Sequence, residues 1–319
     1  MNLTNITGIS LPLAVWLASD SYDFSAKGKS ISATSLLKPL RQILLSERLT
    51  DETEETPDVS DFIASRLGHS IHDGIEQAWK HNYGKALKTL GYPDHIIDRI
   101  QVNPEKPEPG TIPVYLEQRA SRKVKGYTIS GKYDMILEGV LQDFKSTSVY
   151  SWIMGSKDED YCLQGSIYRW INQDKVTADH MNIQFIFTDW SKAQSKQSNN
   201  YPQQRVLEHR VELMSLVETE TWIMKKLSDL EDAADMDEAD IPRCTDKDLW
   251  RGETVYKYFS NPAKTDGRAT KNFKSAGEAS AHKAAQGKGI IITIPGKVKA
   301  CGYCRAFNAC SQKDEYDHG

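Results

Sequence analysis

Two extended runs near the middle of the chain predict a β-hairpin. The runs are Ser130–Leu137 and Val140–Ser146, which are rich in β-branched and aromatic residues. Glu138-Gly139 between them is typical of a two-residue turn. Because side chains on a strand alternate between its two faces, the pattern also predicts which polar side chains of the hairpin lie together.

The hairpin gathers charged side chains on one face. Asp134 lies on the first expected strand, and Asp143 and Lys145 lie on the second. Asp143 and Lys145 are two positions apart and therefore point the same way, while Phe144 points to the opposite face. We expect a carboxylate and an ammonium group side by side.

The remaining pattern alternates between helical and extended segments. Helices are expected at residues 39–48, 62–83, 86–100, 161–172 and 216–230, and further strands at 111–120, 183–189 and, as an edge strand, 206–213. Loops are expected at 51–61 and 101–110, and an irregular leader at 1–30. This order predicts an α/β protein with a mixed central β-sheet flanked by helices.

Length and composition fit a globular protein of one large or two modest domains. The chain has 319 residues, a mass of 36.0 kDa and 39% hydrophobic residues. It contains no apolar run of about 18 residues, and its beginning lacks the basic segment and cleavage site of a secretory signal. We expect a cytoplasmic protein without a membrane segment.

The charge is unevenly distributed. A net charge of −4 argues against a protein that coats nucleic acid indiscriminately. Residues 229–240 contain seven acids and no base, whereas residues 257–305 contain ten Lys or Arg against Asp266 and Glu278. The acidic segment is expected to be a solvated linker or helix end. The basic segment either follows phosphates or forms an ordinary solvated surface.

Several basic residues are candidates for contact with the phosphates of DNA. They are Arg119, Arg122, Lys123 and Lys125, just before the hairpin, and Lys271 and Lys274 in the basic segment. A solvated turn is the alternative explanation for the first group.

The hairpin carboxylates suggest a chemistry. Asp134 and Asp143 on adjacent strands can hold a hard divalent cation such as Mg²⁺ or Mn²⁺ through oxygen. Lys145 beside them can orient or deprotonate a water, or neutralise charge on a phosphate. The alternative is a cross-strand salt bridge on a solvated sheet face.

The residues of the hairpin resemble a known signature. Gly131-Lys132-Tyr133-Asp134 followed by Asp143-Phe144-Lys145-Ser146-Thr147 resembles that of the RecB-like branch of the PD-(D/E)XK nucleases. Upstream, residues 68–72 (GHSIH) resemble the G-x-x-x-H helix of that branch, and downstream, residues 164–168 (QGSIY) resemble its Q-x-x-x-Y helix. The four motifs occur in the family's order.

The resemblance implies a restriction-endonuclease-like core and several site residues. It implies that His72 is a further metal ligand or orients the metal, that the Phe144 carbonyl can bind metal, and that Glu117 has a supporting role, either beside the metal or in the structure. It also implies that Gln164 and Tyr168 face the site and contact DNA or the attacked phosphate, with ordinary helix surface as the alternative. A packed histidine is the alternative for His72, and His69 is a rival for its role.

The cysteines form a second group. Cys301, Cys304 and Cys310 have the spacing C-x2-C-x5-C, and Cys244 precedes them. In a cytoplasmic protein such spacing favours metal over disulfides. The trio resembles the iron–sulfur site of RecB-like nucleases, although residues 39–48 lack the early cysteine that this family often has there. Cys244 is the expected fourth ligand of a [4Fe–4S] cluster, with zinc and then unligated thiols as alternatives.

The fifth cysteine, Cys162, is expected to stay free. The expected role of the cysteine site is structural, tying the tail to the nuclease core.

These observations predict a domain organisation and a function. We expect a leader at 1–30, a nuclease core at 31–228, an acidic linker at 229–240 and a basic, cysteine-containing extension at 241–319. The expected activity is that of a divalent-metal-dependent exonuclease on linear DNA, with no fused helicase because no Walker-type phosphate loop occurs. The alternatives are a catalytically quiet DNA-end-binding module and a restriction-type endonuclease. The resemblance also implies a single-strand annealing protein as partner, and a homo-oligomer is an open expectation.

Overall fold

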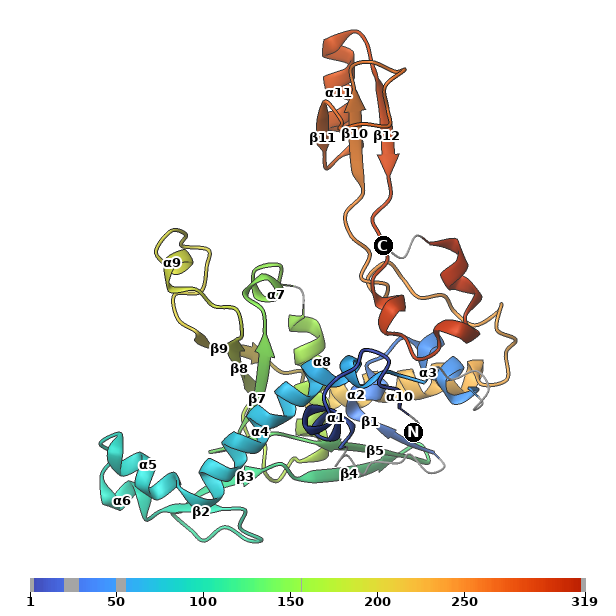
Figure 1. Cartoon of the computed structure of the whole chain (residues 1–319). Coiled ribbons are helices and arrows are strands. Elements are labelled where there is room, and N and C mark those ends of the chain that lie inside the picture. Colours follow the sequence, from blue (N-terminus) through green and yellow to red (C-terminus); the bar gives the residue numbers. More distant parts are fainter. Residues whose placement is uncertain (1–2, 20–28, 50–55, 156, 317–319) are drawn as a thin grey trace. The chain divides into compact units, whose positions relative to one another are not determined.

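The computed structural model describes residues 3–19, 29–49, 56–155 and 157–316 (Figure 1). The chain divides into two compact units, one of residues 1–37 and 55–228 and the other of residues 38–54 and 229–319. Several mixed sheets flanked by helices confirm the predicted α/β class.

The first unit is built around a six-stranded mixed sheet with the order β2-β3-β6-β7-β8-β9. Its strands are β2 (Ile100–Val102), β3 (Ile112–Leu116), β6 (Met135–Leu137), β7 (Val140–Thr147), β8 (His180–Phe187) and β9 (Val206–Glu212). β7 and β8 pair in parallel, and β9 closes the edge antiparallel to β8. The prediction of an edge strand near residues 206–213 is therefore confirmed.

A second, three-stranded sheet of this unit has the order β1-β5-β4. It consists of β1 (Ser30–Ser32), β4 (Arg119–Val124) and β5 (Tyr127–Lys132). β5 is antiparallel to β4 and parallel to β1.

The predicted hairpin is correct at its turn and wrong in its first strand. Glu138 and Gly139 have φ of 51° and 78°, the left-handed pair that a type I′ turn needs. The expected strand 130–137, however, is divided between β5 and β6, which belong to different sheets. The Tyr133 side chain is fully buried and its hydroxyl donates to Gln118 Oε1 at 2.9 Å. Burying this ring takes the chain from one sheet to the other immediately before Asp134.

The expected strand 111–120 is also divided in two. β3 ends at Leu116, Glu117 adopts φ of 49°, and β4 begins at Arg119. Non-glycine residues rarely adopt this left-handed conformation, so the strand pattern held no sign of the break. Two strand interruptions, at Glu117 and at Asp134, therefore face each other, and Glu117 N donates to Asp134 O at 2.9 Å.

Helices cover the sheets of the first unit. They are α1 (Leu11–Ala18), α2 (Ala33–Leu36), α4 (Ile63–His81), α5 (Tyr83–Thr89), α6 (Asp94–Ile97), α7 (Val149–Ile153), α8 (Asp158–Ile171), α9 (Lys192–Ser195) and α10 (Leu216–Ala233), with the 3₁₀ helix η1 (Val59–Phe62) before α4. α4 packs on β7, and α8 packs on β5 and β9. The long helices α4, α8 and α10 were predicted to within a few residues.

Three local predictions were wrong. The leader is not wholly irregular, because α1 forms in it and β1 begins at its last residue, Ser30; residues 20–28 lie outside the described part. The expected helix 86–100 ends at Thr89, since Pro93 disfavours helical geometry at the residue before it, and β2 starts at Ile100. Within the expected loop 51–61, η1 begins at Val59; residues 51–55 lie outside the described part.

The second unit begins with α3 (Leu40–Glu47), shorter than the expected helix 39–48 because Pro39 stands outside it as N-cap. The other elements are β10 (Val255–Phe259), β11 (Lys271–Phe273), α11 (Ala276–Gln286), β12 (Ile290–Ile294), η2 (Ala300–Tyr303), η3 (Phe307–Ala309) and η4 (Ser311–Glu315). The acidic segment 229–240 is not all linker, since its first residues, through Ala233, continue α10. Among the described residues, no helix is long and apolar enough to cross a membrane.

Candidate metal centre and active site

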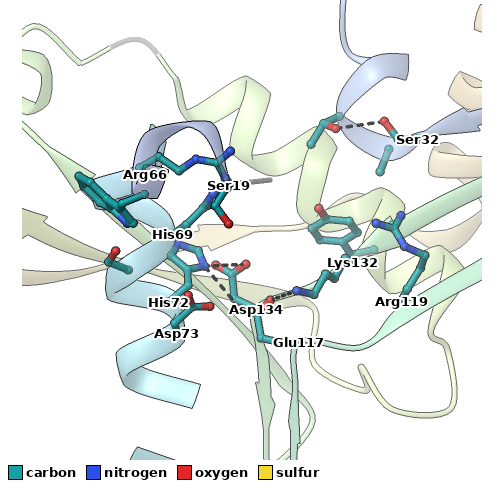
Figure 2. A pocket seen from close by; sticks show the side chains of 16 residues that line it. Ser19, Ser32, Arg66, His69, His72, Asp73, Glu117, Arg119, Lys132 and Asp134 are labelled. Carbon is teal, nitrogen blue, oxygen red and sulfur yellow. Dashed lines mark hydrogen bonds and ion pairs between the residues drawn. The ribbon is translucent and has the colours of Figure 1, made fainter. Parts of the chain in front are cut away.

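Three side chains from separate elements converge in the first unit. His72 of α4, Glu117 after β3 and Asp134 before β6 each offer a ligand atom, and these atoms lie within 4.8 Å of one another. His72 Nδ1 is 3.5 Å from Glu117 Oε1 and 3.4 Å from Asp134 Oδ1. Figure 2 shows the three side chains pointing toward one another. One imidazole and two carboxylates form a donor set suited to a divalent cation.

The backbone of β7 orients two of these groups. His72 Nε2 lies 3.0 Å from the Phe144 carbonyl oxygen, to which it donates, and Phe144 N donates to Asp134 Oδ2 at 2.8 Å. A hydrogen bond from Nε2 leaves Nδ1 as the imidazole atom that faces the carboxylates. The Phe144 carbonyl, expected as a metal ligand, thus accepts a hydrogen bond from His72 in this structure.

Glu117 is held by a residue that the sequence analysis passed over. Lys132 Nζ lies 2.6 Å from Glu117 Oε2. Lys132 is the second residue of the G-x-x-D motif and ends β5, so the change of sheet at Tyr133 separates it from Asp134 and strand periodicity gave no signal for it. It adds a cation beside the two carboxylates (Figure 2).

The charges of this group are coupled. Hydrogen bonds to Asp134 and Glu117 raise the pKa of His72 to about 10, although burial opposes the shift. Burial alone would raise the pKa of Glu117, but His72 and Lys132 outweigh it and lower that pKa. At neutral pH Glu117 is therefore ionised and His72 is positively charged beside it.

Asp143 and Lys145 lie side by side on β7, which confirms the predicted shared face. Lys145 Nζ is 2.7 Å from Asp143 Oδ2, and the Asp143 side chain is only 5% exposed. The Lys145 ammonium group is thus the cation that faces this buried carboxylate oxygen. Asp143 is not among the three groups within 4.8 Å of one another.

Burial shifts the pKa values of both Asp143 and Lys145. Burial raises the pKa of Asp143, and the charge of Lys145 offsets only part of that rise. Burial lowers the pKa of Lys145, but Asp143 and Asp134 outweigh it, and the net shift is upward. Lys145 is therefore a stable cation in the metal-free protein.

Gln164 and Tyr168 share a face of α8, as expected from their spacing. Gln164 Nε2 donates to the Tyr168 hydroxyl oxygen at 3.3 Å. Burial raises the pKa of Tyr168 to about 12, so its phenol stays protonated. Tyr168 borders the same cavity as the His72 group.

A cavity of about 450 Å³ opens over the His72, Glu117 and Asp134 group. Its lining includes three further polar residues, Arg66, His69 and Arg119 (Figure 2). Arg66 was missed by the sequence analysis; it is buried and its Nε donates to Leu17 O at 3.1 Å. His69, the rival of His72, lies at the wall rather than within the three-residue group.

The other basic residues before the hairpin differ in their surroundings. Arg122 donates to Trp170 O at 2.9 Å and stacks on the Trp170 ring, 4.5 Å from its centroid. Lys125 Nζ donates to Ser228 Oγ at 2.7 Å. Lys123 is exposed on β4. Of this group, only Arg119 lines the cavity.

The second unit brings together four of the five cysteines. Cys244, Cys301, Cys304 and Cys310 line one cavity of about 30 Å³. Burial raises the pKa of Cys244 to about 12 and also raises the pKa values of Cys301 and Cys304. No three of these sulfurs, all of them in the described part, come within 4.8 Å of one another. Cys162 lies apart on α8 in the first unit.

A buried arginine contacts the cysteine group. Arg41 of α3 is 3% exposed, and its Nε donates to Cys310 Sγ at 3.1 Å. Its Nη1 donates to the carbonyl oxygens of Glu238 and Ile241, each at 3.0 Å, and its Nη2 pairs with the Glu238 carboxylate. The sequence predicted this helix, but nothing in its pattern pointed to Arg41 as a partner of the cysteines.

Comparisons with known proteins give little further information. No family model matches the chain, and no curated protein matches it. Among solved structures, one described as "Crystal structure of SSO0001" matches with a TM-score of 0.40 and 16% sequence identity, covering 65% of this chain and 78% of that one.

Proposed function

We propose that the protein is a divalent-metal-dependent deoxyribonuclease of the PD-(D/E)XK superfamily, in its RecB-like branch. The observation that carries the proposal is the convergence of His72, Glu117 and Asp134 in a cavity that Tyr168 also borders. These residues come from four segments far apart in the sequence, three of which belong to the motifs of the proposed family. A restriction-endonuclease-like core with a cysteine-containing extension is part of this proposal.

The donor set fits Mg²⁺ or Mn²⁺. His72, whose pKa the neighbouring Glu117 and Asp134 raise, would give up its proton on Nδ1 to a divalent cation bound between these groups. The bound ion would supply Lewis acidity at the phosphate to be cleaved.

The chain's own residues would complete the chemistry. Lys145 is held as a cation by Asp143 and Asp134, and this favours a role in stabilising negative charge on the phosphate over a role as base. The protonated phenol of Tyr168 would donate a hydrogen bond to DNA, with Gln164 holding its hydroxyl. Arg119 at the cavity wall would contact a backbone phosphate.

The favoured activity is exonucleolytic, on the ends of linear DNA in the cytoplasm, in recombination or DNA processing. A single-strand annealing protein is the proposed partner, and a homo-oligomer is compatible with this activity. The second candidate is a catalytically quiet DNA-end-binding module. The intact Asp143–Lys145 pair argues against it, because the proposed cleavage chemistry uses the Lys145 cation that Asp143 holds, whereas binding alone does not require it. The third candidate is a restriction-type endonuclease.

The four cysteines would hold a structural [4Fe–4S] cluster. A tetrahedral zinc site places its sulfurs about 3.8 Å apart, given zinc–sulfur bonds of about 2.3 Å. Because no three of the four sulfurs lie within 4.8 Å of one another, we favour a cluster, whose cysteines bind different irons. Arg41 would donate a charge-assisted hydrogen bond to the Cys310 thiolate.

Cleavage assays test the proposed function. End-labelled linear DNA and closed circular DNA are incubated with the purified chain and Mg²⁺, Mn²⁺ or EDTA, beside an Asp143→Ala control. Metal-dependent loss of the linear substrate alone supports the exonuclease. Cutting of circles indicates the endonuclease, and binding without cutting indicates the end-binding module.

A further inference from the structure

Residues 255–294 form a ββαβ element of their own within the second unit (Figure 1). β10 is the central strand of a three-stranded antiparallel sheet with the order β11-β10-β12. α11 packs on this sheet, where His282 contacts Tyr258 edge-on at 4.9 Å between ring centroids and Phe273 at 5.1 Å. The element lies in the sequence between Cys244 and Cys301.

Two chain segments join this element to the rest of its unit, and they cross closely. Gly252 N donates to Lys297 O at 3.0 Å, and Arg251 Nε donates to Gly296 O at 3.3 Å. A Cβ on Gly296 would overlap the backbone of Gly252, coming within 3.0 Å of its Cα and closer still to its carbonyl group. A glycine is required at this crossing, which marks the base of the element.

The strand directions place the basic residues at the other end. Val255 pairs with Ile294 near the base, and Phe259 pairs with Ile290 at the far end. The connection between β10 and β11 lies at that far end, as does Lys288, whose carbonyl oxygen accepts from the Tyr258 hydroxyl at 3.0 Å. α11 starts toward the base and runs outward. The basic residues of the far end are Lys264, Arg268, Lys271, Lys283 and Lys288, all exposed.

This far end has a charge opposite to that of the whole chain. The element contains seven Lys or Arg and two acids, in a chain whose net charge is −4. Of the two acids, Glu278 lies in the first turn of α11, toward the base, and its backbone N donates to the Oγ of the N-cap Ser275. Only Asp266 shares the far end with the five basic residues.

The far end is chemically suited to a polyanion rather than to a protein surface. Residues 260–270 (SNPAKTDGRAT) contain no large apolar side chain that could anchor a protein interface. They contain hydroxyl and amide groups of the kind that contact phosphates. The connection is braced, because Thr270 Oγ1 accepts from Ser260 N at 3.1 Å and donates to Ser260 Oγ at 3.2 Å.

We propose that the far end of the ββαβ element is a second DNA contact, which binds backbone phosphates without regard to sequence. This inference rests on the proposed function, since DNA is the polyanion that a nuclease meets. Binding here would be electrostatic, so it would weaken steeply with salt. It would raise the affinity for DNA without taking part in the chemistry.

A binding experiment in EDTA tests the proposal separately from cleavage. Fluorescence anisotropy with a labelled linear duplex is measured for the parent chain, for the triple variant Lys264→Gln, Arg268→Gln, Lys271→Gln, and for a matched triple variant Lys85→Gln, Lys88→Gln, Lys106→Gln. Both triple variants remove three exposed charges. The far-end variant is expected to bind at least about tenfold more weakly than the parent. The slope of log affinity against log salt concentration should be shallower by about 0.9 for each phosphate that the variant no longer neutralises. The matched variant should bind like the parent.

Distinct outcomes separate the two proposals. Equal affinity of the two triple variants overturns the second contact while leaving the nuclease proposal intact, and capture of an acidic protein would then explain the far end. A parent chain that binds no DNA in EDTA but cleaves linear DNA with Mg²⁺ overturns the second contact alone, whereas a chain that neither binds nor cleaves DNA overturns both proposals. A charge-preserving variant, Lys264→Arg with Lys271→Arg, should bind like the parent; weak binding by it would overturn the electrostatic account.

Discussion

The ring of Tyr168 occupies the space that a side chain at Gly131 would need. A Cβ built on Gly131 would lie 2.8 Å from Tyr168 Cδ1 and closer still to Cε1. A glycine is needed at position 131 because it has no side chain. This lets α8 bring Tyr168 against β5 at the edge of the cavity. The first residue of one motif and the last residue of another are thus a single packing unit.

This packing leads to the first prediction. Gly131→Ala should destabilise the protein by about 1–3 kcal/mol through overpacking and should lower cleavage, because Tyr168 must move. The double variant Gly131→Ala, Tyr168→Ala should lose less stability than the two single variants lose when their losses are added, since the added methyl group then has room. Thermal unfolding of the four proteins measures this; strict additivity would contradict the contact.

Metal affinity tests the carboxylates. Asp134→Asn and Glu117→Gln should each weaken Mn²⁺ binding by at least about tenfold, because even residues around a metal's ligands contribute about 10–100-fold. The electron paramagnetic resonance signal of free Mn²⁺ measures the affinity. Asp73→Asn is the matched control, since Asp73 lines the same cavity outside the three-residue group. An equal decrease in the control would assign the effect to the general charge of the cavity.

Two histidines three residues apart provide a second comparison. His72→Gln should weaken Mn²⁺ binding and cleavage, because its Nδ1 faces both carboxylates, whereas His69→Gln should leave Mn²⁺ affinity close to that of the parent. The same titration measures both. The reverse order of effects would transfer the proposed role to His69.

Lys145 should matter for its charge. Lys145→Met should lower the cleavage rate by about 10²–10³-fold, the loss typical of removing one group that stabilises charge in a transition state. Lys145→Arg should retain part of the rate, since it keeps the cation. Single-turnover cleavage at saturating Mg²⁺ measures this, with circular dichroism as a check on folding. Full activity of the methionine variant would remove Lys145 from the mechanism.

The cysteine group should affect stability and colour. Cys304→Ser should lower the visible absorption of an iron–sulfur cluster and the melting temperature, because the cavity loses one ligand. Cys162→Ser is the matched control and should change neither, since Cys162 lies outside that cavity. Absorption spectra, iron and zinc analysis and thermal unfolding measure these effects. Loss of cleavage with unchanged metal content and unfolding would contradict a structural role.

Arg41 offers an independent test of the same region. Arg41→Leu leaves the Glu238 carboxylate and two backbone carbonyl groups without their buried donor, so a loss of about 3–5 kcal/mol in stability is expected. Arg48→Gln is the control, because Arg48 donates to Ala234 O at the surface. Thermal unfolding measures both, and similar small shifts would show that Arg41 is not a structural link.

Local pattern was enough to predict much of the fold. The turn follows from the Glu138-Gly139 pair between two extended runs. The shared face of Asp143 and Lys145 follows from the period of two along a strand, and the edge strand near residues 206–213 follows from its extended pattern. The long helices follow from their apolar spacing. Each of these features depends on residues close together in the chain.

The structure alone decided how the site is assembled. The sequence could not show that the chain changes sheets at Tyr133, that Glu117 adopts a left-handed conformation, or that Lys132 pairs with Glu117. The sequence could not show that His72, and not His69, lies beside the carboxylates, nor that Arg41 donates to Cys310. These features depend on contacts between segments tens to hundreds of residues apart. Local periodicity carries no information on such contacts, whereas burial of Tyr133 and the packing of α4 and α8 fix them.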